Sequence, residues 1–98
     1  MGKILRVVLD VLKPHDPSII DLASLLSDLQ GVENVNISIY EMDRRVENVK
    51  ITLEGTDIDY DKVARMIIDQ GGTVHSIDEV VAGCEIIEDA ETLQDHGN

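Results

Sequence analysis

The chain has 98 residues, of which 20 are acidic and 8 basic, so its formal net charge is −12. This charge repels nucleic acid and anionic membranes and favours cationic partners or metal ions, although an acidic solvated surface is the simpler interpretation. A hydrophobic content of 43% suits one globular domain, and the presence of two tyrosines without Phe or Trp argues against base-stacking platforms.

The N-terminus and the single cysteine indicate a cytoplasmic protein. Cys84 has no partner in the chain, so neither a disulfide framework nor a thiolate metal cluster is expected. The first residues lead directly into a strand pattern without the apolar segment of a signal peptide. No stretch approaches the roughly 18 apolar residues of a membrane span. We therefore expect a cytoplasmic location and no contact with membranes.

The first predicted strand, residues 4–12, carries a carboxylate in an otherwise apolar run. One face of this strand is wholly apolar, and we expect it to lie against helices. That face consists of Leu5, Val7, Leu9 and Val11. Arg6, Val8 and Asp10 then lie on the open face. Because a charge on a strand must meet water or a partner, Asp10 marks a candidate site.

A helix is predicted next. Asp16 is expected to be its N-cap, with Pro17 at the first helical position, and apolar residues recur at helical spacing until Gly31. Two strands follow over residues 35–40 and 49–53, where apolar and polar side chains alternate with period two. The polar residues between them predict a hairpin turn.

A second helix is predicted to begin at the N-cap Asp59, with Ile58 and Val63 placed as a hydrophobic staple. A shift of 41 positions brings Leu22 of the first helix onto Val63 and Gly31 onto Gly72. The chain therefore looks like a duplicated strand-helix-strand unit.

The last predicted strand, residues 73–87, is longer than the strand it would pair with. Its excess, residues 80–87, is rich in β-branched side chains and would be an aggregation-prone edge if it stayed unpaired. We expect it to bend at Asp78-Glu79 or at Gly83 and to pair with an edge, either within its own chain as a fifth strand or on a neighbouring subunit. Residues 89–98 are predicted to be an acidic, frayed tail.

The element order βαββαβ predicts an α+β fold, a ferredoxin-like sandwich over residues 1–88 with an extended C-terminal strand. Its antiparallel sheet would have the strand order 4-1-3-2, with both helices on one face. The open face is mixed in polarity, so we expect another subunit or a ligand to cover it. The predicted interface residues are Arg6, Val8, Tyr40, Val80, Val81 and Ile86.

This topology would gather acidic and imidazole side chains at one end of the sheet. The predicted metal ligands are Asp10, His15, Asp16, Glu54 and His75, with Asp78 and Glu79 as a second acidic pair. Carboxylates alone suit calcium or magnesium, whereas a mixture of His and carboxylates suits zinc or manganese. The structural alternatives are a helix cap for Asp16, a loop position for His15, and a salt bridge from Arg6 to the 78–79 pair.

Four segments of the chain, residues 6–17, 35–37, 49–55 and 75–83, resemble an archaeal family catalogued as domain of unknown function two hundred and eleven. The likeness covers roughly residues 3–88. It implies a small cytosolic protein of ferredoxin-like fold that forms homo-oligomers, with no established activity.

The leading functional hypothesis is a non-enzymatic homo-oligomer that binds a small ligand or a divalent cation at or near subunit interfaces. The first alternative is a metal-dependent enzyme that uses Asp10 and His75, and the second is a structural adaptor for a cationic protein. The chain lacks a CxxC motif, the aromatic residues of an RNA-binding sheet and a nucleophile elbow around any serine. These absences argue against several better-known functions of the fold.

Overall fold

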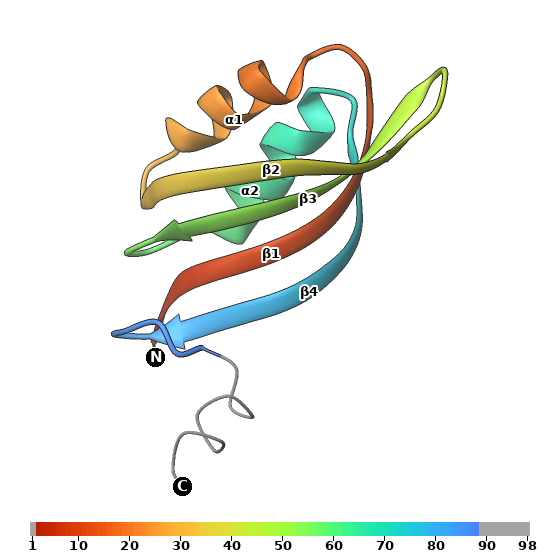
Figure 1. Ribbon diagram of the computed structural model, residues 1–98. Helices are drawn as coiled ribbons and strands as arrows, with labels where there is room; N and C mark the ends of the chain where they lie inside the picture. The colour runs from red at the N-terminus through yellow and green to blue at the C-terminus, as the bar shows by residue number, and fades with distance from the viewer. Residues whose placement is uncertain (1, 89–98) are drawn as a thin grey trace, which may run out of the picture.

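The computed structural model describes residues 2–88, which form a four-stranded sheet and two helices (Figure 1). The elements are β1 (Lys3–Pro14), α1 (Ile19–Ser27), β2 (Val32–Met42), β3 (Val46–Gly55), α2 (Tyr60–Asp69) and β4 (Thr73–Gly83). The sheet is antiparallel with the order β2-β3-β1-β4, so the predicted ferredoxin-like α+β fold and strand order are confirmed. The predicted tail, residues 89–98, lies outside the described residues. No helix in residues 2–88 is long and apolar enough to cross a membrane.

The core lies between the helices and one face of the sheet, and it is built from aliphatic side chains. Its central members are Val7, Leu9, Val11, Val49, Ile51 and Leu53 from the sheet, and Leu22, Leu26, Val63 and Ile67 from the helices. The alternation predicted for β1 is therefore confirmed from Val7 onward. Nearer the N-terminus the register shifts between Ile4 and Arg6, and Ile4, rather than Leu5, packs against the core.

Helix α1 begins two residues later than the sequence predicted. Its N-cap is Ser18, whose hydroxyl accepts a hydrogen bond from the Asp21 backbone N–H at 3.2 Å. The assignment of Asp16 as N-cap was wrong because a serine followed three residues later by an acidic residue is the stronger start signal. Helix α2 begins after Asp59 as predicted, and the Asp59 carboxylate accepts from the backbone N–H groups of the first turn.

Strand β4 pairs with β1 along its whole length, although its residues from Val80 onward were expected to extend beyond that strand. Strand β1 has 12 residues and begins at Lys3, so it is long enough to match the 11 residues of β4. Bulges at His75 and Asp78 take up the extra residues of β4. Val80 therefore pairs within its own chain, and residues 2–88 contain no fifth strand. The strand ends at Gly83, where φ is 138°, one of the two predicted bends.

The loop before α2 lies against the turn that enters β2. The Gly31 carbonyl oxygen accepts hydrogen bonds from the backbone N–H groups of Thr56 and Asp57, at 3.0 and 3.4 Å. Gly31 has a φ of 90°, and a Cβ at this position would lie 2.1 Å from the Asp57 carbonyl oxygen. Glycine is therefore required here both by backbone conformation and by close approach.

Candidate functional site: charged side chains along β1

Strand β1 lies in the centre of the sheet, and beyond Lys3 it carries charged side chains at three levels. We call them the Arg6 group, the Asp10 group and the Lys13 group, after the β1 residue of each. The predicted metal ligands do not meet at one end of the sheet: some are divided among these groups, and Asp16 and His75 belong to none of them. Within residues 2–88, no three His, Cys, Asp or Glu side chains lie close enough to hold a metal ion.

In the Arg6 group, one guanidinium on the open face binds three carboxylates. Arg6 Nε donates to Glu54 Oε2 at 2.8 Å, Nη1 donates to Glu79 Oε2 at 3.1 Å, and Nη2 donates to Glu88 Oε1 at 3.1 Å. The Arg6 side chain is only 15% exposed, and its hydrogen bonds lower the pKa of Glu88. The salt bridge from Arg6 to the 78–79 pair, which was the structural alternative to a metal site, is therefore present, and Glu79 forms it. Glu88 also ties the segment after β4 to the sheet.

In the Asp10 group, Asp10 accepts a hydrogen bond from the Tyr40 hydroxyl, which reaches from β2 across β3. This bond, with burial as a smaller cause, raises the pKa of Tyr40 to about 12. Tyr40 therefore keeps its proton at neutral pH and remains a donor. The expected neighbour His75 lies in a bulge, so Ser76 stands opposite Asp10 in the register. The Ser76 hydroxyl donates to Asp78 at 2.7 Å.

The Lys13 group lies at the end of β1 that meets the β2–β3 turn. The Lys13 side chain is only 2% exposed, and its Nζ donates to Glu47 Oε1 and to the Pro14 carbonyl oxygen, both at 2.8 Å. The second oxygen of Glu47 lies 2.8 Å from His15 Nδ1, and His15 Nε2 lies 2.9 Å from the Asp43 carbonyl oxygen. Lys13 and, to a smaller extent, His15 lower the pKa of Glu47.

Lys13 and Glu47 were not predicted from the sequence as neighbours of His15. A signal was present, because Lys13 continues the alternation of the core residues Leu9 and Val11 and so belongs to the buried side of β1. A buried lysine needs a carboxylate nearby, and Glu47 lies directly opposite it in the register of β1 and β3. With both of its ring nitrogens engaged, His15 has none left for a metal ion in this arrangement. Asp16 is exposed in the loop before α1.

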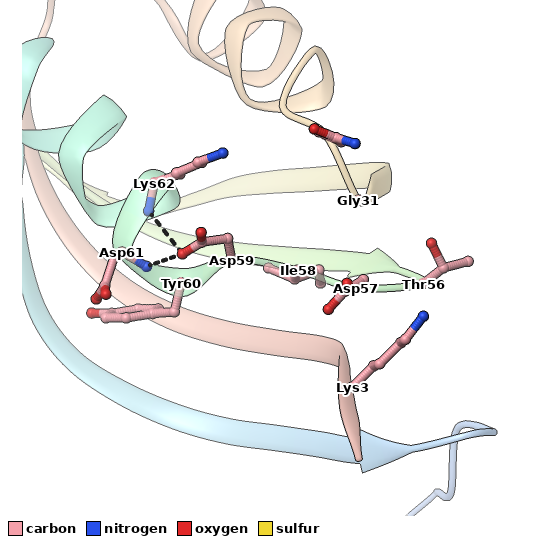
Figure 2. A pocket seen from close by; sticks show the side chains of 10 residues that line it. Lys3, Gly31, Thr56, Asp57, Ile58, Asp59, Tyr60, Asp61 and Lys62 are labelled. Carbon is pink, nitrogen blue, oxygen red and sulfur yellow. Dashed lines mark hydrogen bonds between the residues drawn. The ribbon is translucent and has the colours of Figure 1, made fainter. Parts of the chain in front are cut away.

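A cavity of about 740 Å³ opens beside the first turn of α2 (Figure 2). Lys3 of β1, Gly31 and the loop 56–58 form its walls together with the start of α2. Charges of both signs line it, namely Lys3, Lys62, Asp57, Asp59 and Asp61. Figure 2 shows that one Asp59 oxygen, Oδ1, accepts the capping bonds from the backbone N–H groups of Asp61 and Lys62. The sequence analysis did not predict this cavity.

Two apolar side chains of β4, Ile77 and Val80, form what we call the β4 strip. Ile77 pairs with Leu9 and Val80 with Val7, so both lie on the helix side of the sheet beside core residues. They are nevertheless 49% and 52% exposed. Helix α2 covers only the beginning of β4, and Figure 1 shows the rest of the strand curving away from both helices. At the opposite edge, the helix-side residues of β2 pack against the core.

The predicted interface residues differ in how much surface they offer. Val8 is buried, Arg6 and Val81 are half-buried, and Tyr40, Val80 and Ile86 are exposed. Of this set, Val80 alone belongs to the β4 strip.

The family described as DUF211, uncharacterized ArCR, matches residues 5–96 of this chain. The chain is also similar to an uncharacterized protein of Methanocaldococcus jannaschii, with 53% identity over 95 residues. That alignment covers 97% of this chain and 98% of the relative. The likeness therefore includes all four strands and both helices.

Proposed function

The chain belongs to the archaeal DUF211 family, and we propose that it is a non-enzymatic binding module whose copies associate along β4. The β4 strip is the observation that carries this proposal. Ile77 and Val80 continue two rows of core residues to the edge of the sheet, yet half of each side chain is exposed. Burial of apolar surface stabilises an assembly by about 25 cal/mol per Å². A second copy presents the same apolar strip and is the partner that fits it.

The net charge of the chain supports β4 as the edge along which copies associate. Copies of a chain with a net charge of −12 repel one another over most of their surface, so they should meet where acidic groups are absent or neutralised. The strip itself is uncharged. Of the two acidic residues between Ile77 and Val80, Glu79 is paired with Arg6, and Asp78 accepts a hydrogen bond from the Ser76 hydroxyl. The bulges at His75 and Asp78 interrupt the outer edge of β4. We therefore expect side-chain packing, more than a continuous strand ladder, to hold the copies together.

The association is tested by the molar mass of the unmodified full chain in solution. Light scattering coupled to gel filtration is expected to give a whole multiple of the 10.8 kDa chain mass, two or higher. The mass should fall on dilution if exchange between copies is fast. A mass of 10.8 kDa at every concentration up to the millimolar range would overturn the proposal.

For the ligand, we favour a small molecule that carries both charges, bound in the cavity beside α2. The cavity volume of about 740 Å³ lies within the usual range of small-molecule sites. Lysine ammonium groups on its wall suit a carboxylate, and the carboxylates of Asp57 and Asp61 suit an amine. A divalent cation is less well supported, because within residues 2–88 no three of the predicted ligands lie close enough to hold one.

Calorimetry with free amino acids as probes tests the ligand, and Lys62→Ala is expected to abolish the binding heat of any amino acid that binds. Lys50→Ala is the matched control, because Lys50 is an exposed lysine on β3 that does not line the cavity. The same titration with calcium, magnesium, manganese and zinc is expected to give no heat. Saturable binding of one of these ions that Asp10→Asn removes would favour the metal-dependent alternative instead.

A further inference from the structure

The two ring nitrogens of His15 both face groups that can only accept hydrogen bonds. Nδ1 lies 2.8 Å from Glu47 Oε2, and Nε2 lies 2.9 Å from the Asp43 carbonyl oxygen. A neutral imidazole has one N–H and one lone pair, so it could satisfy one of these partners and would repel the other. Only the imidazolium form donates to both. Glu47 is held as a carboxylate by Lys13, which is buried against it.

We propose that His15 is a proton-controlled latch that joins the β2–β3 turn, residues 43–45, to the end of β1. In the protonated state the ring bridges Glu47 and the Asp43 carbonyl oxygen. When the ring loses a proton, one nitrogen becomes an acceptor and the bond to Asp43 is lost. The turn then separates from β1 at this point, while the Lys13–Glu47 pair stays in place on the core side.

The internal hydrogen bonds of the turn do not involve His15, so they remain when the latch opens. The Asp43 carboxylate accepts from the backbone N–H groups of Arg45 and Val46 at 2.7 and 2.9 Å, and the Asp43 N–H donates to the Val46 carbonyl oxygen at 3.0 Å. These bonds close the turn without His15. The latch therefore controls where the turn lies and leaves its internal structure intact.

The charges around His15 favour the protonated form. Glu47 is the main cause of the raised pKa of His15, burial opposes it, and the backbone of Asp43 and Arg44 adds to it. The other charged groups at this place are Lys13, which acts through Glu47, and the Asp43 carboxylate; Asp16 is the next residue in the loop. Because the pKa is raised above the ordinary value of 6.5, the closed, protonated form predominates below pH 6.5, and the latch opens as pH rises through the folded-state pKa.

The latch holds a part of the surface whose charge differs from the rest of the chain. Arg44 and Arg45, two of only eight basic residues, lie exposed in the turn beside the exposed Met42. Closing the latch therefore fixes a cationic and apolar tip relative to an otherwise acidic sheet. This inference uses only contacts within one chain, so it does not depend on the proposed association along β4.

Nuclear magnetic resonance of the ¹⁵N-labelled full chain tests the latch. The His15 ring nitrogens are expected to show the shifts of an imidazolium at pH 6 and to titrate with a midpoint above 6.5. The backbone amide shifts of residues 43–46 should titrate with the same midpoint, because the imidazolium bonds to the Asp43 carbonyl oxygen. Amides in the centre of β1 and β3 should not respond.

The variant His15→Gln removes the titrating ring at a partly exposed position, so the fold should survive. The chemical shifts of its turn amides are expected to lose the titration that those of the unmodified chain show with the His15 ring. A ring that titrates below pH 6.5 would overturn the latch. So would turn amides that ignore the ring titration, or that respond to pH in the same way in His15→Gln.

Discussion

The Glu47→Ala variant is expected to lose about 3 kcal/mol of unfolding free energy, because it removes the carboxylate that neutralises a buried lysine. Lys13 is 2% exposed and would keep a hydrogen bond to the Pro14 carbonyl oxygen without any charge partner. We expect the lower end of the range for broken buried pairs, since the Glu47 side chain is 10% exposed and water can reach Lys13 once it is gone. Urea unfolding at pH 7 measures this loss.

The unfolding free energy lost in Glu47→Ala is expected to become smaller at acidic pH. Lys13 and His15 lower the pKa of Glu47 below its ordinary value of 4.5, so the stabilisation by this carboxylate is present above pH 4.5 and is lost as pH falls through the folded-state pKa. The difference in unfolding free energy between the unmodified chain and Glu47→Ala should therefore reach its full size at pH 7 and decrease at acidic pH.

Two controls separate a buried charge pair from a general effect of mutation. The double variant Lys13→Met with Glu47→Leu removes both charges and should recover to within about 1 kcal/mol of the unmodified chain, or exceed it. Glu41→Ala, at an exposed position of β2, should change stability by about 0.5 kcal/mol or less. A double variant as unstable as Glu47→Ala alone would contradict the account.

The order of strands and helices could be predicted, because period-two alternation identifies the strands and apolar residues at helical spacing identify the helices. Val7, Leu9 and Val11 lie on the core side as parity required. The start of α1 was misplaced because Asp16 and Ser18 are both good caps, and only Ser18 has Asp21 three residues after it. The pairing of β4 was misjudged because bulges take up two of its residues and the strand ends at Gly83, so residues 80–82 pair with β1 residues already included in the predicted strand.

The candidate site was less predictable, for two physical reasons. Bulges at His75 and Asp78 shift the β4 register, and a shift of one residue turns each later side chain to the other face. The position of the Asp43 carbonyl oxygen, which holds His15, depends on the backbone of the turn and leaves no trace in residue types. The burial of Lys13, in contrast, follows from the parity of β1 and could have been predicted.

If copies associate along β4, a lysine introduced into the β4 strip at Val80 should strongly weaken that association. Val80 is 52% exposed in the single chain, so a lysine there can reach water and should leave the fold intact. In an interface the same lysine would be buried without a partner. That costs about 3 kcal/mol, and since 1.4 kcal/mol is tenfold in affinity, association should weaken by about a hundredfold or more.

The matched control is Ile20→Lys, which makes the same change of charge on α1, where Ile20 is 77% exposed. It adds a lysine to the acidic chain without touching β4. If charge alone governed association, both lysine variants would behave alike.

The central claim is tested most directly by the molar masses of the unmodified chain, Val80→Lys and Ile20→Lys, measured side by side by light scattering at one concentration. We predict a multiple of 10.8 kDa for the unmodified chain and for Ile20→Lys, and 10.8 kDa for Val80→Lys. Circular dichroism should report the same fold for all three. A Val80→Lys protein that keeps the mass of the unmodified assembly would contradict association along β4.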